Sequence, residues 1–490
     1  MNVLLLSNSA PNYFNFFNAL AQCFAKDGAT VTVAVDSTFS REENGLDELG
    51  FDVYDFSSYH STHQIDREIL AKYSDFDLNR ALLSDFERAE VYGVWGKNVD
   101  IEFYDRLKSG LLSYFEEIFD KHNIDVVIYE NVSNAFAHFA LYVAKKKGAV
   151  YCGIGGSRLP GRFSVTSDPL ADVETEKAFA AIRTGELDVT PDVRQWATKY
   201  ISEIETVVPD YMKINGLDRI GLMKRYLRLD RLGKLKSLMR HAFDSRTGAF
   251  QSGNPLCTHF NLFARNVRRR LKIGQVRHLY QEPVQGERFL LYPMHFHPES
   301  STSILAGTYL DEYEVIRNIA FSLPEGVRLY VKDHISAWGY PSLDFYQRVR
   351  RLPNVRLLGP NAPTKELIKH SVGVITLTST VGYEALLLKT RVYLYGKVFY
   401  EFHKGVVRIE NPTRLRELIL DNMIKPVDWD DAYNNDFVCA YHQATLPGTL
   451  NLMQGSLEAR ETAERIYAVL TSEYRVLSDS FIHETSDDDH

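Results

Sequence analysis

The sequence contains few cysteines and no long hydrophobic run. Its 490 residues include four cysteines, Cys23, Cys152, Cys257 and Cys439, and no two of them have C-x-x-C spacing. This scatter argues against a disulfide framework and a cysteine-based zinc site, and it favours a reducing cytoplasm. No apolar run approaches the ~20 residues of a membrane-spanning helix. The amino terminus lacks the basic segment and cleavage site of a signal peptide, so we expect residues 3–7 to form a strand.

The composition is that of a folded protein with an uneven charge distribution. Hydrophobic residues make up 45% of the sequence, which excludes general disorder and provides for two core-forming domains plus an insertion. Residues 211–280 carry 16 Lys and Arg against 3 Asp and Glu, in a chain of net charge −8. Because no DNA- or RNA-binding module is recognisable, we expect an anionic membrane surface or glycan as partner, and no nucleic acid. The alternative is a set of helices that bury their leucines and solvate their charges.

A hydroxyl-rich bend joins a buried strand to a helix near residue 378. The apolar run 372–375 predicts a parallel strand, and residues 384–389 predict a helix without a breaker. Between them lie Thr378, Ser379 and Thr380, where unpaired helix N–H groups and the positive end of the helix dipole converge. Such a bend can bind phosphate. The alternative is an ordinary hydroxyl N-cap.

Neighbouring strands support the phosphate interpretation. Residues 391–396 predict a second strand after one short helix, which completes a parallel unit of the doubly wound kind. Upstream, residues 328–334 predict a strand that ends in Lys332 and His334. Both side chains would face the crevice at the carboxyl ends of the strands, where they suit the developing charge of a nucleotide leaving group.

Four segments in a fixed order resemble the capsule polysaccharide biosynthesis family, which includes the bacterial β-Kdo transferases. They are Tyr292–Ser300, Leu329–His334, Thr378–Leu386 and Gly396–Tyr400. The resemblance covers roughly residues 287–410, and its most specific part is the hydroxyl-Val-Gly-x-Glu-Ala-Leu element with the later Gly-x-x-x-Tyr. One departure is Ile335, which follows His334 where family members commonly have proline. The first half of the chain resembles the family only in architecture.

The resemblance implies an α/β protein of the GT-B type, with two Rossmann-like domains whose parallel sheets face a cleft, plus a basic helical insertion. The expected divisions are an N-terminal acceptor domain at 1–165, the basic insertion at 166–285, a C-terminal nucleotide-sugar-binding domain at 286–425, helices that return to the first domain at 426–480, and an acidic tail at 481–490. The expected donor-binding residues are Lys332, His334, Thr378, Ser379, Thr380, Gly382 and Glu384. On the acceptor side, Arg158 and Arg162 flank a glycine-rich turn and suit a carboxylate or phosphate; the alternative is a surface loop.

Three residues are the candidate catalytic groups. The resemblance places the carboxylate of Glu299 close to the reacting sugar carbon, as a nucleophile or a stabiliser of an oxocarbenium-like transition state. Glu130 is the candidate base for an acceptor hydroxyl. His297 lies between His295 and Glu299, but this short loop fixes no obvious metal geometry and we expect no metal. For Glu299 and Glu130 the alternative is a role at the start of a helix.

These features predict a metal-independent glycosyltransferase of bacterial capsule or lipopolysaccharide synthesis. It would need no cofactor. Its donor would be a nucleotide sugar, and the resemblance favours CMP-Kdo. It would act on a glycan or glycolipid in the cytoplasm, with peripheral contact to the anionic inner membrane. The alternatives are a nucleotide-sugar epimerase or polyol-phosphate transferase of the same architecture, or a non-catalytic polysaccharide-assembly subunit. Donor sugar, acceptor, linkage, stereochemistry and oligomeric state stay open.

Overall fold

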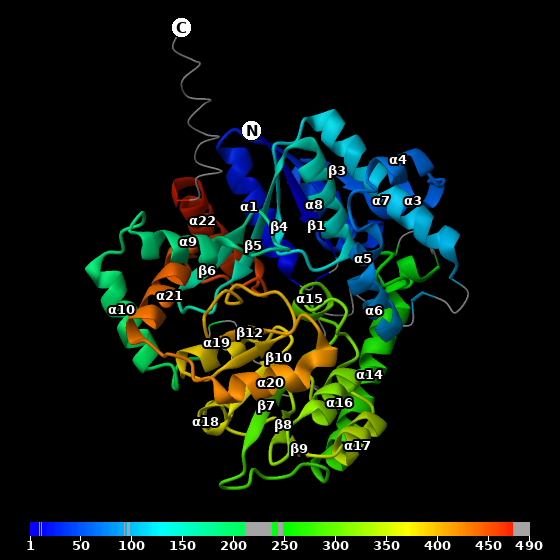
Figure 1. Cartoon of the computed structure of the whole chain (residues 1–490). Helices are drawn as coiled ribbons and strands as arrows, with labels where there is room; N and C mark the ends of the chain where they lie inside the picture. Colours follow the sequence, from blue (N-terminus) through cyan, green and yellow to red (C-terminus); the bar gives the residue numbers. More distant parts are fainter. Residues whose placement is uncertain are drawn as a thin grey trace. The chain divides into compact units, whose positions relative to one another are not determined.

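The chain divides into two compact units, each built on one sheet. The computed structural model describes residues 1–8, 10, 12–92, 94–95, 99–208, 210, 238–243 and 248–473. Unit 1 comprises Met1–Pro169, Pro209–Phe263 and Thr445–His490, and unit 2 comprises Leu170–Val208 and Ala264–Ala444. Both sheets consist mainly of parallel strands (Figure 1), so the α/β class predicted from the sequence is confirmed.

The sheet of unit 1 has the strand order β13-β6-β5-β4-β1-β2-β3 among the described residues. The strands are β1 (Asn2–Ser7), β2 (Thr30–Val35), β3 (Asp52–Asp55), β4 (Val126–Glu130), β5 (Val150–Gly156), β6 (Arg162–Thr166) and β13 (Thr445–Pro447). Strands β1 to β5 run parallel, whereas β6 and β13 add an antiparallel edge. The amino-terminal segment is therefore the interior strand β1, which pairs with β2 and β4.

The helices of unit 1 cover this sheet and its edge. They are α1 (Tyr13–Lys26), α2 (Thr38–Glu43), η1 (Leu46–Leu49), α3 (Phe56–Thr62), α4 (Arg67–Lys72), α5 (Leu78–Ala81), α6 (Leu83–Tyr92), α7 (Ile101–His122), α8 (Ala135–Lys147) and α22 (Ser456–Glu473). Helix α22 packs against α1 although it lies far away in the sequence (Figure 1). The contact includes the Phe24 and Tyr467 rings, 4.8 Å apart, and a 2.8 Å hydrogen bond from the Tyr467 hydroxyl to Asp27.

The sheet of unit 2 is parallel throughout its described strands, in the order β12-β11-β10-β7-β8-β9. They are β7 (Phe289–Pro293), β8 (Arg328–Lys332), β9 (Val355–Leu358), β10 (Gly373–Thr376), β11 (Val392–Leu394) and β12 (Val406–Arg408). The chain proceeds from β7 through β8 to β9, and then crosses to the other side of β7 to form β10. This reversal creates a switch point between β7 and β10, where doubly wound sheets bind ligands at the carboxyl ends of their strands.

Most helices of unit 2 lie around that sheet. They are α9 (Glu174–Thr184), α10 (Pro191–Ser202), α15 (Ser300–Ser303), α16 (Glu312–Ser322), α17 (Leu343–Arg351), α18 (Thr364–His370), α19 (Thr380–Leu387), η3 (Pro412–Arg414), α20 (Leu415–Ile424) and α21 (Asp431–Gln443). Helices α9 and α10 are the exception, since they pack on α21. Helix α14 (Pro255–Arg277) begins in unit 1 and ends in unit 2. Every residue of β7 is buried, and Leu290, Tyr292, Val331 and Ile375 belong to one core, as expected of parallel strands covered on both faces.

Two predicted regions lie wholly or partly outside the described residues. The acidic tail 481–490 is outside them, and so are residues 211–237 and 244–247 of the basic region. Within the part of the chain that the structure describes, no helix is both long and apolar enough to cross a membrane.

Candidate functional site

The switch point of unit 2 brings polar side chains from the ends of β7 and β10 together. His295 lies just beyond β7, and its Nε2 atom is 3.1 Å from the hydroxyl of Thr376, the last residue of β10. The same hydroxyl accepts a 3.1 Å hydrogen bond from the backbone N–H of Ser379. The backbone N–H of Thr378 is 3.5 Å from His295 Nε2. These contacts fix the start of the hydroxyl-rich bend against the end of β7.

A buried carboxylate that the sequence analysis missed holds both histidines of this edge. Glu312, the first residue of α16, accepts hydrogen bonds at Oε1 from the backbone N–H of His295 at 3.1 Å and from its Nδ1 at 3.3 Å. Its Oε2 atom accepts from Nε2 of His297 at 2.8 Å. Burial alone would raise the pKa of the Glu312 carboxyl, but the two histidines hold that pKa well below its usual range. Glu312 is therefore ionised and orients both imidazoles.

The hydroxyls of the bend have different roles. Ser379 is the N-cap of α19, since its side chain accepts a 3.2 Å hydrogen bond from the backbone N–H of Val381. This is the ordinary role considered for the bend. The hydroxyl of Thr378, by contrast, is buried and has no hydrogen-bond partner among the described residues. A buried hydroxyl without a partner is costly, so Thr378 carries the strongest signal for a ligand.

Gly382 is where the start of α19 meets Tyr400. The Tyr400 hydroxyl donates a 2.5 Å hydrogen bond to the carbonyl of Ser379. A Cβ atom on Gly382 would lie 2.4 Å from that hydroxyl oxygen and 2.9 Å from the ring carbon that bears it. A larger residue here would have to displace the first turn of the helix or the Tyr400 ring.

Replacing Gly382 with alanine is expected to lower the free energy of unfolding by about 1–3 kcal/mol, because overpacking displaces the helix start or the ring. Urea denaturation measures this change. Gly274→Ala on α14 is the matched control: a Cβ there meets nothing within 4 Å, so alanine should stabilise the helix by about 0.5–1 kcal/mol. Equal stability of Gly382→Ala and the natural chain would contradict the close approach.

Lys332 ends β8 and His334 lies two residues beyond it, and the two side chains differ in charge at pH 7. The Lys332 ammonium donates to the carbonyl of Pro360 at 2.9 Å, and burial lowers its pKa to about 8. Burial, together with the nearby His295 and Lys332, lowers the pKa of His334 to about 4. Nδ1 of His334 accepts a 3.2 Å hydrogen bond from the backbone N–H of Ser336, so the neutral ring carries its proton on Nε2. His334 is thus a neutral hydrogen-bond donor at pH 7.

Two candidate carboxylates flank the hydroxyl-rich bend in the sequence, with Glu299 before it and Glu384 after it. Glu384 sits one turn beyond Thr380 on α19, with its carboxylate 3.8 Å from the ammonium of Lys365. Glu299 is exposed and immediately precedes α15, where its backbone carbonyl accepts from the N–H groups of Thr302 at 3.1 Å and Ser303 at 2.8 Å. These bonds involve the backbone of Glu299, whereas the alternative concerned its carboxylate and stays a prediction.

The acceptor-side candidates belong to unit 1. Glu130 ends β4, and its carboxylate accepts a 2.6 Å hydrogen bond from the Ser133 hydroxyl. Burial raises the pKa of the Glu130 carboxyl above its ordinary value. Arg162 lies in β6 and donates from Nε to the Thr445 hydroxyl at 2.9 Å and from Nη2 to the Thr445 carbonyl, so its guanidinium joins β6 to β13. Arg158 is half-buried in the turn before β6.

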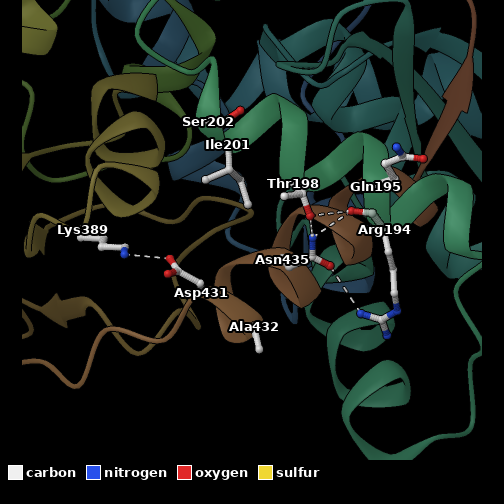
Figure 2. Close-up of a pocket in the computed structure, with 9 residues that line it drawn as sticks. All are labelled: Arg194, Gln195, Thr198, Ile201, Ser202, Lys389, Asp431, Ala432 and Asn435. Carbon is white, nitrogen blue, oxygen red and sulfur yellow. Dashed lines mark hydrogen bonds and ion pairs between the residues drawn. The ribbon is translucent and has the colours of Figure 1, made fainter.

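A pocket of about 720 Å³ lies in unit 2 beyond the opposite end of α19. Figure 2 shows its lining residues: Arg194, Gln195, Thr198, Ile201, Ser202, Lys389, Asp431, Ala432 and Asn435. Its cations are paired, since Lys389 contacts Asp431 of the lining at 2.7 Å and Arg194 contacts Asp436, outside the lining, at 2.8 Å. The pocket lies between α10 and α21. None of its lining side chains is a buried polar group without a hydrogen-bond partner, in contrast to Thr378 at the β7–β10 edge.

The histidines of the edge contact a carboxylate other than Glu299. Both are hydrogen-bonded to Glu312. Among the residues that the structure describes, no cluster of three His, Cys, Asp or Glu side chains is arranged to hold a metal ion.

The family resemblance is confirmed over the segment that contains most of these residues. Residues 299–438 match the family model described as "Capsule polysaccharide biosynthesis protein". No curated protein sequence matches the chain.

Solved structures resemble the chain weakly. Thermosulfurimonas dismutans KpsC, a beta Kdo 2,4 transferase, is 15% identical over 66% of this chain and 85% of its own, with a TM-score of 0.36. The beta Kdo 2,7 transferase of the same protein is 10% identical over 72% and 89%, with a TM-score of 0.32. A UDP-GlcNAc 2-epimerase of Methanocaldococcus jannaschii is 11% identical over 96% and 99%, with a TM-score of 0.25.

Proposed function

We propose that this chain is a glycosyltransferase of bacterial surface polysaccharide synthesis that takes its sugar from a nucleotide donor. The observation that carries the proposal is the buried, unpartnered hydroxyl of Thr378 beside the start of α19, at the switch point of a parallel sheet. This position combines a hydroxyl donor with the positive end of a helix dipole, as phosphate binding requires. It also lies within the segment that matches the capsule polysaccharide biosynthesis model.

The donor phosphate is proposed to bind Thr378 and the first turn of α19. Ser379 and Thr380 present that turn, and Gly382 allows its close packing on Tyr400. His334 adds a neutral N–H donor. Lys332, which is hydrogen-bonded to the carbonyl of Pro360, contributes positive charge. Glu384, one turn along α19, is proposed to accept hydrogen bonds from hydroxyl groups of the donor. CMP-Kdo is the favoured donor because of the motifs shared with the β-Kdo transferases.

The chemistry is transfer of a glycosyl group from phosphate to a hydroxyl. The bond between the anomeric carbon and the donor phosphate breaks, and the acceptor oxygen forms the new bond. Glu299 is proposed to attack the anomeric carbon or to stabilise its positive charge in the transition state. His297, two residues before it in the sequence, is oriented by Glu312. Glu130 is proposed to take the proton of the acceptor hydroxyl, and Arg158 and Arg162 to bind an anionic acceptor group.

A panel of nucleotide sugars tests this function. The purified chain is incubated with CMP-, UDP- and GDP-linked sugars and a glycolipid acceptor, and the free nucleotide and the product are measured. Release of CMP with a sugar-extended acceptor is the expected result. A changed sugar on an intact nucleotide would show an epimerase, and a transferred polyol phosphate would show the related transferase. No reaction with any donor would favour an assembly subunit.

Replacing Thr378 with valine is expected to raise the dissociation constant of the donor about tenfold, or about 1.4 kcal/mol. Valine keeps the shape and removes the unpartnered hydroxyl, so the fold should not be weakened. Isothermal titration calorimetry gives both affinities. Thr364→Val at the start of α18, the helix that follows β9 in the same sheet, is the matched control and should bind the donor like the natural chain. Unchanged affinity in Thr378→Val would contradict the phosphate site.

A further inference from the structure

One face of helix α14 turns the basic side chains of Arg265, Arg269 and Lys272 toward the protein. Arg265 and Arg269 lie over the Tyr340 ring at 4.1 and 4.3 Å, and Nε of Arg269 donates to the carbonyl of Trp338 at 2.5 Å. Lys272 donates to the carbonyls of Tyr340 at 2.9 Å and Pro341 at 2.7 Å. The basic residues of this face therefore hold the helix to the loop after β8, through cation–π contacts and hydrogen bonds.

The opposite face of α14 exposes apolar side chains. Phe260, Val267 and Leu271 are 68%, 41% and 72% exposed. Their separations of seven and four residues place them on one line along the helix, which we call the apolar ridge. An ordinary surface helix turns such an apolar line inward. The alternative of buried leucines and solvated charges rested on leucines at 217–232, which lie outside the described residues.

Exposed arginines border the apolar ridge on both sides. Arg268 and Arg270 lie roughly 100° and 60° to either side of Val267 around the helix axis, and both are exposed. The 23 residues of α14 include no Asp or Glu. A second copy of this helix would bring arginine against arginine, because it has no acid to offer. The ridge needs a partner that is apolar at its centre and anionic around it.

We propose that the apolar ridge docks on the surface of an anionic lipid bilayer. The boundary between headgroups and acyl chains accepts apolar side chains, and lipid phosphates accept the flanking guanidinium groups. The exposed arginines beside the ridge add electrostatic attraction to an anionic leaflet, and this attraction acts over distances within the Debye length. This inference goes beyond the proposed glycosyl transfer and does not depend on it.

Vesicle co-sedimentation of the full chain tests the proposal. The natural chain should bind phosphatidylglycerol vesicles and not phosphatidylcholine vesicles, and binding should fall as salt screens the charges. Val267→Ser/Leu271→Ser should lower the partition coefficient on phosphatidylglycerol about tenfold or more, and Arg268→Gln/Arg270→Gln should lower it similarly. Circular dichroism checks that each variant is folded, which is expected because the replaced side chains are exposed.

Matched controls test whether vesicle binding depends on the apolar ridge or on any exposed apolar or basic side chain. Phe321→Ser/Ile424→Ser removes two side chains that are 68% and 80% exposed elsewhere in unit 2, and Arg350→Gln/Arg351→Gln removes two exposed arginines of α17. Both should bind like the natural chain. No binding by the natural chain would overturn the proposal, and so would full binding by the folded Val267→Ser/Leu271→Ser variant. A lower oligomeric mass of that variant in light scattering, with vesicle binding unchanged, would show a second copy as the occupant and likewise overturn it.

Discussion

Glu299→Gln is expected to lower turnover about a thousandfold or more, or about 4 kcal/mol of transition-state stabilisation, with little change in donor affinity. A carboxylate that stabilises a cationic anomeric carbon acts in the transition state, so its loss reduces the rate without weakening the ground-state complex. Glutamine keeps the shape of the side chain and removes its charge. The measurement is initial-rate kinetics together with calorimetric donor binding. The exposed position of Glu299 leaves its side chain accessible to a ligand.

Glu325→Gln is the control for that variant, because Glu325 is also exposed in unit 2 but precedes β8 at the amino end of the sheet. It should keep full turnover. If Glu299→Gln retains more than about a tenth of the natural turnover, a loss below about 1.4 kcal/mol, Glu299 has only its helix-start role. The catalytic carboxylate would then be sought at Glu130.

Glu312→Gln is expected to lower the free energy of unfolding at pH 7 by about 3 kcal/mol, because it removes the charge of a buried network and replaces one of its two acceptor oxygens with an NH2 donor, so that one histidine loses its acceptor. The pKa of Glu312 is held below its ordinary value of 4.5 in the folded protein. Its contribution is therefore fully present above that ordinary pKa and is lost as the pH falls through the folded pKa. The difference in stability between the two proteins should shrink in acid.

Urea denaturation at neutral and acidic pH measures this dependence. Glu314→Gln is the matched control, since Glu314 lies on the same helix and pairs at the surface with Arg317. Its loss should cost less than about 1 kcal/mol. If Glu312→Gln is as stable as the natural chain at pH 7, the carboxylate does not hold the two histidines.

Sequence patterns located part of the unit 2 sheet because parallel strands buried on both faces form short apolar runs. The strands predicted at 328–334, 372–375 and 391–396 correspond to β8, β10 and β11. The edge strand β12 (Val406–Arg408) was missed, since its three residues are only half-buried and show no apolar run. Helix α19 begins at Thr380, four residues before the apolar pattern indicated, because Ser379 caps it.

The candidate site depended more on contacts between distant residues. No spacing in the sequence connects Glu312 to His297, and an acid in the first turn of a helix is ordinarily explained by the helix dipole. Ser379, Thr378 and Thr380 had equal weight in the sequence, and only the hydrogen bonds separate the capping hydroxyl from the unpartnered one. Arg162 contacts Thr445 across most of the chain, which no local pattern indicates.

A crystal structure of the chain with a bound nucleotide tests most directly where the donor phosphate lies. We predict phosphate oxygens within hydrogen-bond distance of the Thr378 hydroxyl, at the first turn of α19 and the carboxyl ends of β7 and β10. A nucleotide bound instead in the pocket lined by Arg194 and Lys389, or at the end of β4 in unit 1, would contradict this position and the donor-binding role of the hydroxyl-rich bend.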